Sequence, residues 1–133
     1  MYLVDTNVWL ERLLDQKSSE TVGRFLDAIP SDRLCMTDFA FHSIAVILTR
    51  LKRTQALLRL AQDSFVDGAV ALISLRREDT RRLVQAIEQF NLDFDDAYQY
   101  VAAEKHNLTI VSFDSDFDRT ERGRKTPAEI LPA

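Results

Sequence analysis

Residues 92–118 read LDFDDAYQYVAAEKHNLTIVSFDSDFD, and the prediction of the fold starts from this stretch. Asp93 is a natural N-cap for a helix that continues through the alanine-rich segment behind it. Residues 108–113, LTIVSF, then have the composition of a short buried strand. Asp114 and Asp116 follow this strand directly, so the unit is a helix and a strand that ends in carboxylates.

The N-terminal segment has a similar strand end, because YLVD at 2–5 reads as a buried strand that finishes in Asp5. Further strands are predicted at 33–37 and 69–75, and AEIL at 128–131 is expected to add a short edge strand. Helices are predicted at 7–15, 19–29, 54–67 and 78–90. One more helix, DFAFHSIAVILTRL at 38–51, is apolar on almost every side and is expected to be buried. This alternation predicts an α/β fold of three layers, an open parallel sheet of four to five strands with helices on both faces.

The composition is that of an ordinary globular chain, with 46% hydrophobic and 29% charged residues. No repeat or linker divides the 133 residues, so we expect a single domain over residues 1–133. A single cysteine, Cys35, excludes an intrachain disulfide and a CxxC metal site. The start MYLVDTNVW does not resemble a signal peptide, and no stretch reaches the roughly 18 apolar residues of a membrane span. We therefore expect a cytoplasmic protein with no membrane contact.

Carboxylates follow the first and the fourth predicted strands, at the carboxyl end of each. If the first and fourth strands are neighbours, Asp5, Asp95, Asp96, Asp114 and Asp116 meet at one edge of the sheet, where ligand sites form in folds of this class. Carboxylates at close range repel one another unless a cation lies between them. Oxygen ligands without His or Cys favour Mg²⁺ or Mn²⁺. Such a site suits phosphodiester hydrolysis, in which metals activate water and neutralise charge.

Each carboxylate also has a purely structural interpretation. Asp5 could cap the helix that follows it, and Asp96 could be the third residue of a capping box on Asp93. Asp114 and Asp116 could be turn formers. Each alternative is reasonable singly, but all of them would have to hold together at matching strand ends.

Four motifs in this order resemble one known family. They are DTNVWL at 5–10, LCMTDFAFHSI at 34–44, DDAYQYVAAEKHNLTIVSFDSDF at 95–117 and RTERGRKTP at 119–127. Together they resemble the PIN-domain family of small metal-dependent ribonucleases, which includes the toxin subunits of VapBC-type toxin–antitoxin pairs. The resemblance implies an endonuclease that hydrolyses RNA with Mg²⁺ or Mn²⁺, a possible antitoxin partner and a homodimer.

The resemblance also implies roles for individual residues. Asp5, Asp96 and Asp114 match the catalytic, metal-binding acids of the family. Asp116 matches a frequent accessory acid at the metal, and Asn7 matches a polar helper beside the first aspartate.

One position departs from the family pattern, because Ser43 stands where a glutamate is usual on the third helix. A hydroxyl is a poor substitute for a carboxylate in holding a divalent cation. Asp38 and His42 are possible accessory residues, and they share a helix face. Asp38 lies about 140° round the helix from Ser43, so it cannot simply replace that side chain. His42 has the alternative of a structural hydrogen bond to Asp38.

The segment RTERGRK at 119–125 is locally basic, although the whole chain has a formal net charge of -4. That net charge excludes a globally basic nucleic-acid binder. The basic residues follow directly on the acidic edge, so we expect them to contact RNA phosphates, with a solvated loop as the alternative. These predicted RNA-binding residues are Arg119, Arg122, Arg124 and Lys125.

Two other functions compete with the nuclease. A PIN-like RNA-binding or regulatory protein, with catalysis weakened by Ser43, would keep the fold and lose most of the chemistry. A phosphatase that uses Asp5 as its nucleophile would want a second aspartate two residues on, and Asn7 stands there instead.

Overall fold

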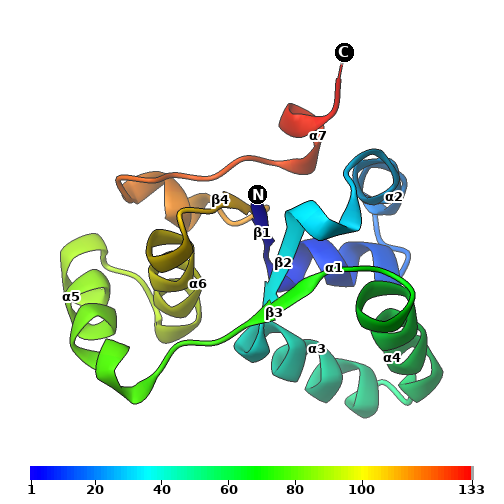
Figure 1. Ribbon diagram of the computed structural model, residues 1–133, viewed down its shortest axis with the longest axis horizontal. Coiled ribbons are helices and arrows are strands. Elements are labelled where there is room, and N and C mark those ends of the chain that lie inside the picture. Colours follow the sequence, from blue (N-terminus) through cyan, green and yellow to red (C-terminus); the bar gives the residue numbers. More distant parts are fainter. Residues whose placement is uncertain (133) are drawn as a thin grey trace.

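A parallel four-stranded sheet forms the middle of the structure, a computed structural model that describes residues 1–132 (Figure 1). The sheet has the strand order β3-β2-β1-β4. Its strands are β1 (Tyr2–Val4), β2 (Leu34–Thr37), β3 (Ala71–Ile73) and β4 (Thr109–Val111). The first and fourth strands are neighbours, in a register that pairs Val4 with Val111, so the condition for the carboxylates to meet is fulfilled.

Helices cover both faces of the sheet. On one side lie α1 (Thr6–Leu13), α2 (Ser19–Ala28), α3 (Asp38–Arg50) and α4 (Thr54–Ala61), and on the other lie α5 (Thr80–Phe90) and α6 (Phe94–His106) (Figure 1). Strand side chains alternate between these layers, since Leu3 and Ile110 pack with α5 and α6 while Val4 and Val111 pack with α1 to α4. The three-layer α/β fold with a parallel sheet is therefore as predicted.

Capping residues set most helix boundaries. The side chains of Thr37 and Asp93 accept hydrogen bonds from the first turns of α3 and α6, and the cap at Asp93 is as predicted. Asn91 and Asn107 end α5 and α6 with φ values of 53°, a left-handed conformation that asparagine tolerates. The helix predicted at 54–67 is shorter, because α4 passes into a π-helical turn over Gln62–Val66.

The predicted edge strand in AEIL is wrong. These residues belong to α7 (Pro127–Ile130), which starts with proline and has a capping box formed by Thr126 and Glu129. The strand-like pairing lies just before it, where Lys125 N donates to Ile110 O at 2.8 Å and Ser112 N donates to Lys125 O at 3.0 Å. A single bridge at Lys125 thus extends the sheet beyond β4.

The expectation that the third helix is buried on all sides is also wrong. Only Ala40, Ile44 and Leu48 of α3 are buried, and they form one stripe at helical spacing. The other apolar side chains of α3 are half-buried and border surface clefts. Within residues 1–132, no helix has the length and apolar character needed to cross a membrane.

The order of the strands places a topological switch between β1 and β4. The chain moves outward from β1 through β2 to β3 and then returns to β4 on the other side of β1. Ligands of open α/β sheets bind outside the carboxyl ends of strands at such a switch. Asp5 and Ser112 follow directly on the paired residues Val4 and Val111, so they lie side by side there.

Candidate metal centre

Asp5 occupies the centre of the switch and is only 6% exposed. Its Oδ1 accepts hydrogen bonds from Thr6 N at 2.8 Å and from Gln99 Nε2 at 2.9 Å. Its Oδ2 accepts a hydrogen bond from Ser112 Oγ at 2.7 Å. Burial raises the pKa of Asp5, while these donors oppose that rise. Asp5 therefore does cap the first turn of α1, and it also faces the other carboxylates.

Asp96 and Asp114 reach the same place from α6 and from the end of β4. One carboxylate oxygen from each of Asp96, Asp114 and Asp116 lies within 4.8 Å of the others. Burial, followed by the charge of Asp114, raises the pKa of Asp96 to about 8. In the described residues 1–132, no ion pair involves Asp5, Asp96 or Asp114. Among the described residues, Asp96 and Asp114 therefore have no cationic side chain paired with them, whereas Asp116 pairs with Arg119.

A cleft of about 580 Å³ opens over these carboxylates. Its polar end is lined by Asp5, Asp96, Asp114 and Gln99, together with Asp95 and Asn7. Its opposite wall is one face of α3, with Phe39, His42, Ser43, Val46, Ile47 and Arg50. Ser43 thus lines the same cleft as the carboxylates, and Arg50 lies about two helical turns farther along the same face of α3.

Of the possible accessory residues, Asn7 makes hydrogen bonds at the site, whereas Asp38 lies outside the cleft. Asn7 holds the end of β4, since its Nδ2 donates to Ser112 Oγ at 3.3 Å and its Oδ1 accepts from Phe113 N at 3.2 Å. Asp38 does not line the cleft, because its Oδ1 accepts hydrogen bonds from Tyr98 Oη at 2.7 Å and from Phe39 N at 2.8 Å. No hydrogen bond between Asp38 and His42 occurs within residues 1–132, and His42 is exposed at the rim.

The basic segment is tied to the protein more tightly than its sequence indicates. Arg119 donates to Phe90 O at 3.1 Å and to Asn91 O at 2.6 Å, and it pairs with Asp116. Arg122 donates to Asn107 Oδ1 and Leu108 O, each at 3.1 Å.

Arg124 pairs with Asp118 and donates to Ser112 O at 3.2 Å. Lys125 is exposed and has no ion pair in the part of the chain that is described. The three arginines therefore have structural contacts, and Lys125 is the freest cation of the segment among the described residues.

Two side chains at this site were missed by the sequence analysis. Gln99 lies one helical turn after Asp96 and therefore on the same face of α6, and this spacing was an available signal. Ser112 is the first residue after β4, and its contact with Asp5 depends on the pairing of β1 with β4.

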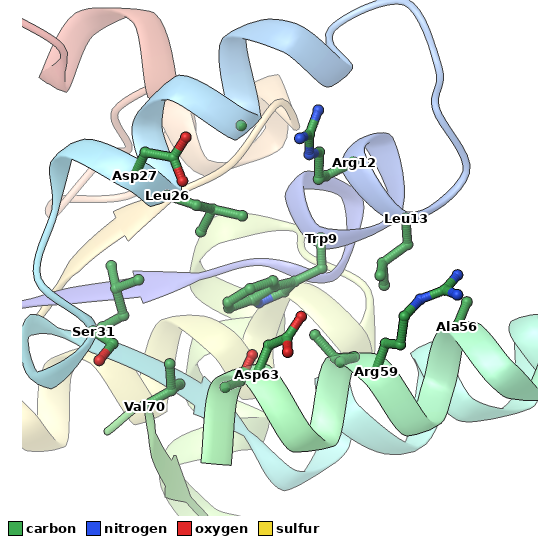
Figure 2. A pocket seen from close by; sticks show the side chains of 14 residues that line it. Trp9, Arg12, Leu13, Leu26, Asp27, Ser31, Ala56, Arg59, Asp63 and Val70 are labelled. Atoms are coloured by element: carbon green, nitrogen blue, oxygen red, sulfur yellow. The ribbon is translucent and has the colours of Figure 1, made fainter. Parts of the chain in front are cut away.

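A second cavity of about 480 Å³ lies apart from the carboxylates, between α1, α2 and α4. Figure 2 shows Trp9 between α2 and α4, with Leu13 and Leu26 nearby. Charged residues of both signs surround this apolar floor, namely Arg12, Asp27, Arg59 and Asp63 (Figure 2).

Solved structures with this fold include proteins of toxin–antitoxin systems. A toxin–antitoxin complex from Klebsiella pneumoniae is similar with a TM-score of 0.75 and 22% identity over 98% of this chain and 100% of that chain. VapC20 of Mycobacterium tuberculosis, a toxin that cleaves the sarcin–ricin loop, has a TM-score of 0.75 and 15% identity over 89% and 93% of the two chains. FitAB bound to an IR36 DNA fragment has a TM-score of 0.79 and 17% identity over 99% of each chain. At these identities the likeness concerns the fold.

The amino-acid sequence carries a family signal of its own. No curated protein sequence matches the chain at a significant level. The model of the PIN domain family, in contrast, matches residues 2–123, which include all four strands and every carboxylate of the cluster. The sequence match, the parallel sheet and the acidic strand ends agree, and the chain belongs to the PIN domain family.

Proposed function

We propose that the protein is a metal-dependent endoribonuclease that hydrolyses RNA phosphodiester bonds. The observation that carries this proposal is that Asp5, Asp96 and Asp114 line one open cleft at the β1–β4 switch. The carboxylate oxygens within 4.8 Å of one another are those of Asp96, Asp114 and Asp116. Membership of the PIN domain family supports it. The single domain over residues 1–133 and the homodimer that the resemblance implies belong to the same proposal.

The donor set suits Mg²⁺ or Mn²⁺, because it consists of carboxylate oxygens with neither His nor Cys among them. We assign the binding of the cation to Asp5, Asp96 and Asp114, with Asp116 as an accessory ligand. When bound, such an ion would activate water and neutralise charge on the phosphate.

The protein's own side chains would hold the RNA strand in one orientation in the cleft. Arg50 lines the cleft on the wall opposite the carboxylates, where its guanidinium could hold a phosphate of the bound strand. Lys125 lies in the exposed segment after the cluster and would contribute a second phosphate contact. The half-buried side chains of Phe39, Val46 and Ile47 give the cleft an apolar wall against which a base or ribose could pack.

Cleavage of a labelled structured RNA tests the proposal. The wild-type chain would be incubated with Mg²⁺, with Mn²⁺ and with chelator, and Asp5→Asn would be run beside it. We expect cutting that requires the metal and is lost in the variant. Binding of several RNAs without any cutting would contradict the nuclease assignment.

A second candidate function is a PIN protein that binds RNA with weakened catalysis. The observation that favours it is the position of Ser43, which faces the cleft where a fourth carboxylate would complete the site. We predict that Ser43→Glu tightens Mn²⁺ binding by about tenfold, since each carboxylate adds charge to the site. Calorimetry on Ser43→Glu and on Ser43→Ala as the control measures this change.

The cleavage rate of the same variants separates the two candidate functions. A sharp rise in Ser43→Glu would favour the weakened regulatory protein. A rate close to that of the wild type would show that the missing glutamate does not limit the enzyme.

An antitoxin is the proposed protein partner, and we assign it to the second cavity. The cavity has an apolar floor for a nonpolar segment and charges of both signs around it, and it lies apart from the metal centre (Figure 2). Structures with this fold include a toxin–antitoxin complex, which supports an antitoxin as the partner.

Trp9 is the only tryptophan of the chain, so its fluorescence reports on this cavity. We predict that the product of an adjacent reading frame shifts Trp9 emission when it binds, and that Leu26→Asp abolishes the complex while leaving metal binding intact. A complex that forms unchanged with Leu26→Asp would place the partner elsewhere.

A further inference from the structure

A buried chain of hydrogen bonds connects three elements behind the metal centre. Thr37 Oγ1 donates to Gln99 Oε1 at 2.7 Å, and Gln99 Nε2 donates to Asp5 Oδ1 at 2.9 Å. Thr37 is 0% exposed and Gln99 is 3% exposed, so water does not compete for these bonds. The chain joins the N-cap of α3, the middle of α6 and the carboxylate at the end of β1.

The direction of these bonds follows from the groups themselves. A carboxylate only accepts hydrogen bonds, so the amide of Gln99 must turn its N–H toward Asp5. Its amide oxygen then faces Thr37, whose hydroxyl must donate its proton. The same hydroxyl oxygen accepts Ala40 N at 2.9 Å as the cap of α3. Each group therefore has a single orientation that satisfies its neighbours.

The other oxygen of Asp5 is constrained in a similar way. Ser112 Oγ accepts a hydrogen bond from Asp114 N at 3.0 Å and another from Asn7 Nδ2 at 3.3 Å. Its proton is therefore directed to Asp5 Oδ2 at 2.7 Å. A carboxylate has about four lone-pair positions. Thr6 and Gln99 occupy both positions on Oδ1, and Ser112 occupies one on Oδ2.

We propose that Gln99, oriented by Thr37, is a positioning residue that fixes the Asp5 carboxylate so that Oδ2 alone is presented to a divalent cation. This inference rests on the proposed metal-dependent function. It assigns Asp5 as a ligand through one oxygen, whereas a freely rotating carboxylate could approach the ion with both. Because Thr37 also caps α3, the orientation of Asp5 is linked to the helix that forms the opposite wall of the cleft.

The test measures Mn²⁺ binding to the full chain by calorimetry at one pH, with the melting temperature of each variant recorded. Gln99→Leu keeps the side chain close to its original volume and removes both bonds. We expect it to weaken Mn²⁺ binding by about 10- to 100-fold, the usual effect of losing a residue that orients a ligand.

Variants at Thr37 test the same bonds without touching Gln99. Thr37→Val removes the hydroxyl, and Thr37→Ser keeps it. Weaker Mn²⁺ binding in Thr37→Val that returns to the wild-type value in Thr37→Ser supports the positioning role. Thr80→Val is the control, because it removes a hydroxyl that donates to Arg77 O at the start of α5 and that does not line the cleft. Loss of Mn²⁺ affinity in this control would show that general destabilisation explains the effect.

The outcomes separate this inference from the proposed function. If wild type binds Mn²⁺ and a folded Gln99→Leu binds it equally well, Gln99 does not position Asp5, and the metal site stands. If Gln99→Leu does not fold, equal affinities of Thr37→Val and wild type overturn the inference. If wild type itself binds no Mn²⁺, the proposed metal site is wrong and the inference falls with it.

Discussion

At the scale of single residues, the raised pKa of Asp96 shows that placing these carboxylates close together disfavours their ionised form. The side chain is 7% exposed, and the charges of Asp114, Asp93 and Asp5 add to the effect of burial. Both effects hold the pKa of Asp96 at about 8, well above that of a carboxyl group in a short peptide. Binding of a cation has to displace the proton that Asp96 carries below this pKa, which couples metal affinity to pH.

The raised pKa of Asp96 predicts how stability depends on pH without metal. The folded-state pKa of about 8 lies above the unfolded value of 3.8, so this group stabilises the fold fully at low pH and loses that contribution as pH rises toward and through 8. We expect the melting temperature in chelator to fall across this range and to fall less steeply in Asp96→Asn. Saturating Mn²⁺ is expected to restore stability at pH 8.

Thermal melts of both proteins between pH 5 and 9 measure this effect. For each protein, the melting temperature is plotted against pH. The contribution of Asp96 is the difference between the slopes of these two plots, because all other titrating groups are present in both proteins. Identical slopes for wild type and Asp96→Asn would contradict the assignment.

Residues near the site also show how far the sequence alone could be interpreted. Asp5, Asp96 and Asp114 were found because they follow predicted strands or begin a predicted helix, which are local signals. Gln99 and Ser112 are 94 and 107 residues away from Asp5 in the sequence, and only the packing of α6 against β1 and β4 brings them to it. A local pattern carries no information on such a contact.

At the scale of elements, the segment after β4 has contacts that its sequence did not show. Its arginines stay predicted RNA contacts, and their guanidinium groups also bind the C-terminal ends of α5 and α6 and the end of β4. Carbonyl groups at helix ends lack partners within the helix and attract such donors. The sequence shows the charges but not the free carbonyl groups that they reach.

The contacts of Arg119 and the exposure of Lys125 predict different effects when each side chain is removed. Arg119→Ala removes bonds to Phe90 O, Asn91 O and Asp116, and we expect it to lower the free energy of unfolding by about 1–2 kcal/mol. Lys125→Ala is expected to change stability by less than about 0.5 kcal/mol. It should instead weaken RNA binding and reduce its salt dependence by about one phosphate contact.

Urea unfolding and salt-dependent RNA binding of both variants test these two roles. The two roles would be contradicted by the opposite pattern, in which Lys125→Ala is destabilised and Arg119→Ala changes only the affinity for RNA. Arg119 would then be the residue that contacts RNA.

Two element predictions failed for identifiable physical reasons. AEIL has the composition of a short strand, but Pro127 at the first helical position and Glu129 three residues after Thr126 favour a capped helical turn. The helix at 38–51 is apolar on all sides because its second face lines the cleft, not because a core surrounds it. Hydrophobic periodicity alone does not distinguish a core face from the wall of a binding cleft.

At the scale of the whole molecule, the order β3-β2-β1-β4 explains why the site lies where it does. Two crossovers take the chain from β1 to β3 in one direction, and the long crossover through α5 and α6 returns it to the other side of β1. The carboxyl ends of β1 and β4 therefore bring together residues from both ends of the sheet-forming chain and from α6. The alternation of predicted elements was enough to anticipate this class of fold, since parallel sheets follow from strand–helix–strand connections.

The measurement that tests the central claim most directly is the single-turnover cleavage rate of a labelled structured RNA by Asp114→Asn and Asp95→Asn. Asp114→Asn removes one charge of the cluster and can keep the cap, since an amide oxygen can still accept Asp116 N. Asp95→Asn is the matched control, because Asp95 lines the same cleft and lies outside the group of converging carboxylate oxygens. With saturating Mn²⁺, we predict that Asp114→Asn is slower than wild type by about a hundredfold or more and that Asp95→Asn is nearly unchanged. Equal rates for the two variants would contradict the claim that this cluster performs the chemistry.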